Sequence, residues 1–96
     1  MKTYHITALD HTGPETLDKR LQVRPDHLAA MQKLKATGNF ILGGAFLNDA
    51  GKMIGSALIL QFSSDEEMEL WKQNDPYTIA GVWNTIEVRS FKIAAV

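Results

Sequence analysis

The sequence of 96 residues contains no cysteine. Disulfide bonds, thiolate nucleophiles and zinc–sulfur sites are therefore excluded, and nothing points to an oxidising compartment. No apolar run approaches the roughly 18–20 residues that a membrane-spanning helix needs. The first residues, Met1 to His5, include no apolar segment of the kind found in signal peptides. We therefore expect a cytoplasmic protein that is not embedded in a membrane.

The sequence also lacks an excess of positive or negative charge. Ten Lys and Arg residues oppose eleven Asp and Glu residues, and the formal charge is −1. Proteins that bind nucleic acid usually carry a basic stripe, whereas the charges here are interspersed, so we expect no nucleic-acid partner. The three histidines, His5, His11 and His27, lack the spacing of metal ligands, and the Gly43-Gly44 pair lacks the spacing of a phosphate-binding loop. Neither a metal nor a cofactor is expected.

The chain length fits one domain, residues 1–96, and the apolar content of 45% is ordinary for a folded globule. Strand-like patterns cover residues 2–10, 39–47, 53–62 and 83–93, and helix-like patterns cover residues 16–37 and 64–74. Pro25 lies inside the first helical region, so either the helix kinks there or a second helix begins. The order β-α-β-β-α-β predicts a ferredoxin-like α+β sandwich, a four-stranded antiparallel sheet with both helices on one face.

The predicted sheet has apolar residues on both of its faces. In the third strand, Ala57 and Ile59 lie opposite the face that carries Leu58 and Leu60, and Phe91 is similarly placed in the last strand. An antiparallel sheet with one wet face should alternate more cleanly between apolar and polar residues. We therefore expect a second subunit to cover this face, giving a homodimer packed through the sheet.

Three side chains of the first helical region could form a chemical site. Arg20, Arg24 and His27 follow one another at i, i+4 and i+7 and would share a stripe if the helix is continuous. Two cations beside an imidazole favour its neutral form, which suits a general base, and they would attract a carboxylate or phenolate. The alternative, which spacing alone favours, is two solvated arginines and an ordinary surface histidine.

Other candidates have structural alternatives of their own. Asp75 directly precedes Pro76, a typical helix N-cap arrangement, but one carboxylate oxygen can cap while the other orients a histidine. The Ser56 hydroxyl needs a partner on its sheet face, where it would line a pocket or bond to the backbone. Tyr77 belongs to the core or to an interface, or it forms one wall of a pocket.

Four short motifs occur in order along the chain: Arg20-x-x-x-Arg24-x-x-His27-Leu28, Gly43-Gly44, Gly55-Ser56 and Asp75-Pro76-Tyr77-x-x-Ala80-Gly81-Val82. Together they resemble the YCII-related domain family of small bacterial proteins, over nearly the whole chain. The resemblance implies dimers of the α+β barrel type and a His–Asp active site, here His27 and Asp75. Arg20, Arg24 and Ser56 fall on other motif positions that line the same pocket. Ala45 departs from the family pattern, which often has Pro after the glycines.

Two classes of function follow from these residues. In the first, His27 is the general acid–base of a cofactor-independent enzyme, oriented by Asp75, in a proton transfer, isomerisation or elimination on a small oxygenated organic molecule. Among related activities is the dehydrochlorination of a chlorinated hydroxyquinol, an analogy at the level of the fold. The alternative is a non-catalytic dimer, either a small-ligand binder or a structural module. An enzyme requires His27 and Asp75 within hydrogen-bond reach in a concave pocket.

Overall fold

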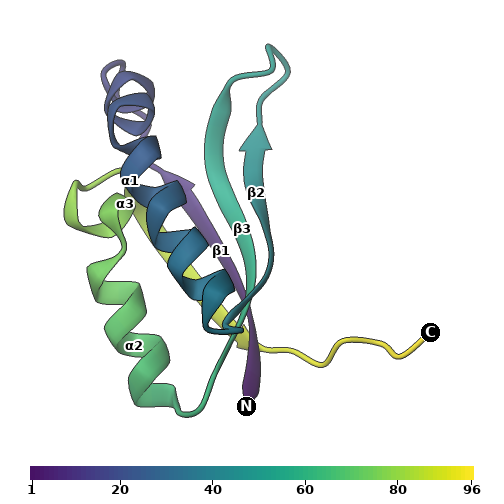
Figure 1. Cartoon of the computed structure of the whole chain (residues 1–96). Helices are drawn as coiled ribbons and strands as arrows, with labels where there is room; N and C mark the ends of the chain where they lie inside the picture. Colours follow the sequence, from purple (N-terminus) through teal and green to yellow (C-terminus); the bar gives the residue numbers. More distant parts are fainter.

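The computed structural model describes residues 1–96, and its strands form one antiparallel sheet. The strands are β1 (Lys2–Asp10), β2 (Phe40–Leu47), β3 (Met53–Phe62) and β4 (Trp83–Ser90), in the spatial order β2-β3-β1-β4. The helices α1 (Thr16–Ala36), α2 (Asp65–Asn74) and the short α3 (Pro76–Ile79) all lie on one side of the sheet (Figure 1). The ferredoxin-like α+β sandwich predicted from the sequence is confirmed.

The core lies between this sheet and the helices. In the central strand β1, Tyr4, Ile6 and Ala8 alternate with more exposed residues and are almost fully buried. The register places Ile6 opposite Leu58 of β3 and Val88 of β4, so the apolar side chains of three strands meet on the helix side of the sheet. A period-2 pattern in the sequence is therefore enough to define the buried face of the sheet.

Helix α1 is continuous through Pro25, so of the two sequence-based alternatives a separate second helix is excluded. Just beyond the end of the helix, Gly38 adopts a positive φ of 77° and the following Asn39 N–H bonds back to the Leu34 carbonyl at 2.7 Å. None of the leucines of α1 is among its buried residues. Arg20, His27 and Met31 are buried. The leucines Leu21 and Leu28 are 50% and 41% exposed.

Polar side chains cap the starts of both α2 and α3. The Ser64 hydroxyl accepts a hydrogen bond from the Glu67 N–H at 3.2 Å and caps the start of α2. Asp75 donates its N–H to the Trp71 carbonyl at the end of α2, and its side chain accepts from the Tyr77 N–H at 2.9 Å to start α3. Asp75 is therefore fixed in position by the ends of two helices.

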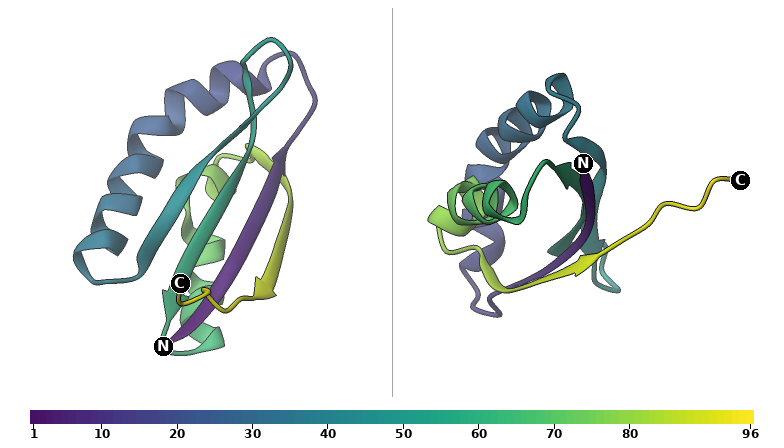
Figure 2. Two further views of the ribbon diagram at one scale, coloured as in Figure 1. Left: turned by 90° about the vertical axis from the view of Figure 1, so that its right-hand side faces the viewer. Right: turned by 90° about the horizontal axis from the view of Figure 1, so that it is seen from below.

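Strand β4 ends at Ser90, three residues before the sequence-based boundary at residue 93. The last backbone bond is from the Phe91 N–H to the Thr3 carbonyl, and β1 begins at Lys2, so no neighbouring strand remains for pairing. Figure 2 shows that the final residues extend away from the body of the molecule, on the side opposite the helices. None of the helices combines the length and the apolar character needed to cross a membrane.

Candidate active site

A cavity of about 140 Å³ lies between α1 and the β2–β3 half of the sheet. Half of the residues that line it are hydrophobic, among them Leu28, Met31 and Leu58. Its polar lining comes from three elements: Arg20, Arg24 and His27 from α1, Ser56 from β3 and Tyr77 from α3. Five of the six residues singled out in the sequence thus border one cavity. The sixth, Asp75, lies behind His27 and does not line the cavity.

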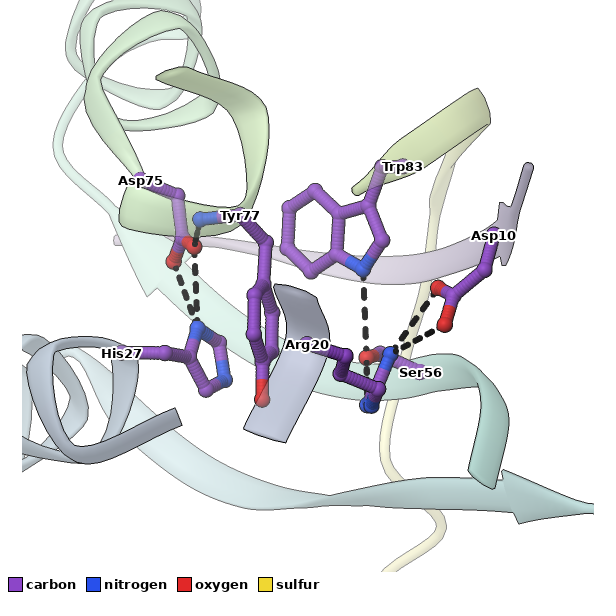
Figure 3. Close-up of polar contacts among 7 residues, drawn as sticks. All are labelled: Asp10, Arg20, His27, Ser56, Asp75, Tyr77 and Trp83. Carbon is purple, nitrogen blue, oxygen red and sulfur yellow. Dashed lines mark hydrogen bonds and ion pairs between the residues drawn. The ribbon is translucent and has the colours of Figure 1, made fainter. Parts of the chain in front are cut away.

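His27 and Asp75 are in direct contact. The His27 Nδ1 atom lies 2.9 Å and 3.0 Å from the two carboxylate oxygens of Asp75 (Figure 3). The Asp75 side chain is fully buried and His27 is only 6% exposed, so water hardly competes for this bond. A carboxylate accepts hydrogen bonds only, so it fixes a proton on Nδ1 and leaves the lone pair of Nε2 free. This arrangement suits a base that acts through Nε2.

The Tyr77 ring packs against one face of the His27 imidazole. Its ring stacks on His27 with 4.2 Å between centroids and 20° between planes. The guanidinium carbon of Arg20 lies 4.6 Å from the Tyr77 centroid, and Figure 3 shows the tyrosine ring standing between His27 and Arg20. Burial raises the pKa of Tyr77 above its ordinary value, although the positive charges of Arg20 and Arg24 oppose the shift. The phenol therefore stays protonated at neutral pH.

Arg20 is held by an acid that the sequence analysis did not single out. Its Nη1 atom donates to both carboxylate oxygens of Asp10, at 2.9 Å and 3.0 Å, and its Nη2 atom donates to the Ser56 hydroxyl at 2.8 Å. The Trp83 indole N–H, 3.2 Å away, also donates to Ser56. Burial raises the pKa of Asp10, and the attraction of Arg20 opposes that rise. Both terminal nitrogens of Arg20 are thus occupied by partners within the chain, and only its buried Nε atom forms no hydrogen bond.

Arg24 differs from Arg20 in this respect. It lines the same cavity, but it is exposed and forms no ion pair or side-chain hydrogen bond within the chain. It is therefore the cation that remains available to an anionic ligand at the mouth of the cavity. The two arginines that look equivalent in the sequence have different surroundings, because only one lies on the helix face that packs against the sheet.

The Gly43-Gly44 pair forms part of the β2 wall. A Cβ atom at Gly43 would lie 2.5 Å from Cδ2 of Leu58 and 3.0 Å from the Phe40 ring, so a side chain there would require these two side chains to shift. At Gly44 a Cβ atom would meet nothing within 4 Å. The structure offers no three His, Asp or Glu side chains grouped to hold a metal ion.

The sequence contains a signal for Asp10 that the analysis of motifs missed. Tyr4, Ile6 and Ala8 face the helices, and continued alternation places Asp10 on the same buried side. An acid there requires a cationic partner, which Arg20 provides. No comparable signal marks Trp83, whose contact with Ser56 depends on the pairing of strands distant in sequence.

The chain is similar in sequence and in fold to several known proteins. The profile of the YCII-related domain matches residues 5–92. Protein YciI of Escherichia coli is 39% identical over 95 residues, covering 93% of this chain and 95% of the relative. The structure of 5-chloro-2-hydroxyhydroquinone dehydrochlorinase (TftG) from Burkholderia phenoliruptrix, a complex with 2,5-dihydroxybenzoquinone, superposes with a TM-score of 0.83 at 31% identity, covering 96% of this chain and 95% of that one.

A more distant structure shares the fold alone. A dimeric ferredoxin-like protein of unknown function from a Jannaschia species superposes with a TM-score of 0.53 at 11% identity. That comparison covers 97% of this chain and the whole of the other.

Proposed function

The chain belongs to the YCII-related domain family, and from that premise we propose that it is a small enzyme that transfers a proton on a small oxygenated organic molecule. The observation that carries the proposal is the buried contact of His27 with Asp75 at the side of a cavity. His27 would take the proton through Nε2, and Asp75 would hold the ring orientation and stabilise the imidazolium that forms. We propose that this chemistry takes place in the cytoplasm and needs no cofactor.

Two further observations support a small planar substrate. The cavity of about 140 Å³ has room for a compound of roughly one ring, and half of its lining is hydrophobic. The related dehydrochlorinase acts on a chlorinated hydroxyhydroquinone, a small oxygenated ring. In the proposal, Arg24 attracts a carboxylate or phenolate group, while Arg20, Ser56 and Tyr77 shape the floor and wall against which the ring lies.

Proton transfer can be tested without knowledge of the physiological substrate. The protein is incubated in D2O with 4-oxocyclohexanecarboxylate, and NMR follows the loss of signal from the C–H groups next to the carbonyl. We expect the wild-type protein to accelerate this exchange and the His27→Gln protein to leave it at the solvent rate. If the wild-type protein binds the compound without accelerating exchange, the alternative function, a non-catalytic small-ligand binder, replaces the enzyme.

The role of Arg24 gives a second test. Replacing Arg24 with glutamine should weaken the binding of benzoate about tenfold, because an ion-assisted hydrogen bond is lost at an exposed position. The affinity for benzamide, which has no charge, should not change. Calorimetric titration of both compounds measures the difference. Lys19→Gln is the matched control, since Lys19 carries the same charge on the same helix but does not line the cavity; an equal loss there would show that only general charge matters.

We also propose that two copies of the single domain, residues 1–96, form a homodimer through the sheet face opposite the helices. Leu42 of β2 pairs with Ile59 on that face and is 62% exposed, and Leu9 and Phe91 are also exposed there. The C-terminal residues project to the same side (Figure 2). Burying several hundred Å² of such surface in each subunit would offset the cost of association.

The dimer is tested by sedimentation equilibrium at micromolar concentration. The wild-type protein should sediment as a dimer, and Leu42→Glu should sediment as a folded monomer, because a carboxylate cannot be buried without a partner. Leu70→Glu is the control: Leu70 is 60% exposed, but it lies on α2, on the helix side of the sheet. A wild-type monomer, or dissociation by Leu70→Glu alone, would contradict the face-to-face arrangement.

A further inference from the structure

The hydroxyl group of Tyr77 has no partner in the protein. Tyr77 as a whole is 1% exposed and its ring is held on both sides, by His27 and by Arg20, yet the hydroxyl forms no hydrogen bond within the chain. Tyr4 is different, because its hydroxyl donates to Asp65 at 2.6 Å. The Tyr77 hydroxyl oxygen is not among the fully buried polar atoms that lack a partner, so it reaches the cavity that Tyr77 lines, where a ligand atom can accept its hydrogen bond.

The direction of the hydroxyl identifies where that ligand atom lies. Tyr77 borders the cavity, and Figure 3 shows its hydroxyl at the same end of the stack as the His27 nitrogen that is not bonded to Asp75. The two rings are nearly parallel, with centroids 4.2 Å apart. A base and a hydroxyl therefore point to the same side from positions about one stacking distance apart.

We propose that this pair selects carbonyl compounds that enolise: His27 Nε2 takes a proton from the carbon next to the carbonyl, and the Tyr77 hydroxyl donates a hydrogen bond to the carbonyl oxygen. The C–H bond breaks, its electron pair moves into the C–C bond, and the carbonyl π electrons move onto the oxygen, so that an enolate forms. Return of the proton from His27 to the same carbon regenerates the substrate, which is the exchange reaction, whereas its delivery to the oxygen gives the enol, an isomer of the substrate. No oxidant, reductant or co-reactant is needed. The inference rests on the proposed proton transfer and adds the substrate class and the group that stabilises the oxyanion.

The geometry fits this class of substrate. The reacting carbon and the carbonyl oxygen are two bonds apart, and hydrogen bonds of about 3 Å can diverge from them to two groups on neighbouring stacked rings. An enolate is planar, which suits a cavity walled by an aromatic stack. The Tyr77 hydroxyl is protonated at neutral pH, because burial raises its pKa, and so it is a donor. A fixed donor in a site with little water stabilises an oxyanion more strongly than water does.

The binding test uses Tyr77→Phe, which keeps the ring between His27 and Arg20 and removes only the hydroxyl. Benzoate and its three monohydroxy isomers are titrated, because a phenol carries its oxygen on a planar ring as an enolate does. At least one isomer should bind the wild-type protein about tenfold more tightly than benzoate, and Tyr77→Phe should lose that preference while keeping its affinity for benzoate. Tyr4→Phe, the matched control, should keep the preference, since Tyr4 does not line the cavity.

The rate test separates this inference from the proposed function. In the exchange assay with 4-oxocyclohexanecarboxylate, Tyr77→Phe should lower the rate about 10²–10³-fold, the usual effect of removing one oxyanion donor. Wild-type exchange that persists in Tyr77→Phe would overturn the role of the hydroxyl and leave proton transfer by His27 intact. A hydroxyl preference that depends on Tyr77, without any wild-type exchange, would support the hydrogen bond and reject the proton transfer. No hydroxyl preference in the wild-type protein, or an equal one in Tyr77→Phe, would overturn the inference.

Discussion

Replacing His27 with glutamine should lower the rate of proton transfer by about 10²–10⁴-fold, the contribution usual for a positioned general base. Glutamine can still donate an N–H to Asp75, so the buried carboxylate keeps a partner, but glutamine has no basic nitrogen. The affinity for benzoate should change little, because Arg24 is untouched. Exchange rates and calorimetric titration measure the two effects. Equal losses of rate and affinity would indicate that His27 holds the ligand and does not move a proton.

Asp75→Asn is the companion variant and acts through the tautomer of His27. Asparagine caps a helix about as well as aspartate, so α3 should remain folded. Its amide cannot accept hydrogen bonds at both positions, and an NH2 group facing Nδ1 would place the proton on Nε2, where the base must be free. We expect most of the loss seen with His27→Gln and a small change in stability. An Asp75→Asn protein with the wild-type rate would show that Asp75 serves as a cap only.

The second large effect concerns stability. Asp10→Ala leaves the Arg20 guanidinium buried without its acid, and breaking a buried ion pair from one side costs about 3–5 kcal/mol. Much of the stability expected of a domain this small would be lost. Urea unfolding followed by circular dichroism measures the change. The slope of the unfolding free energy against urea concentration is compared between variants, since an unchanged slope shows that stability alone has changed.

A double variant distinguishes the effect of the unpaired Arg20 charge from the effect of lost packing. Asp10→Ala combined with Arg20→Met removes both charges and fills part of the volume with an apolar side chain, so it should recover most of the lost stability. If the double variant is no more stable than Asp10→Ala, the loss comes from packing and not from the stranded cation. The double variant should still bind substrates poorly, because the guanidinium no longer supports the ring of Tyr77.

The strands and turns were predictable because local rules determine them. The alternation in residues 2–10 places Ile6 and Ala8 inside, and Gly38 marks the end of α1. The early end of β4 was not predictable from local sequence, since Phe91 continues the apolar pattern. It follows from where β1 begins, at the other end of the chain.

The candidate site could be predicted only in part from the sequence. Spacing placed Arg20, Arg24 and His27 on one helix face, but it could not show that His27 is buried or that Arg20 already has Asp10 as its partner. The leucines of α1 do not mark its buried face, because two charged or polar side chains of this helix turn inward to meet acids. Arg20 is 10 positions from Asp10 in the sequence, and His27 is 48 positions from Asp75. The periodicity of a single helix or strand cannot predict such pairs.

Asp75 has a consequence for motion as well as for chemistry. The carboxylate that orients His27 also accepts the Tyr77 N–H of the first turn of α3, so opening of that turn removes one of the bonds that hold the carboxylate in place. A fluctuation of α3 therefore weakens the support of the histidine. Exchange of the Tyr77 amide proton with solvent reports how often this turn opens.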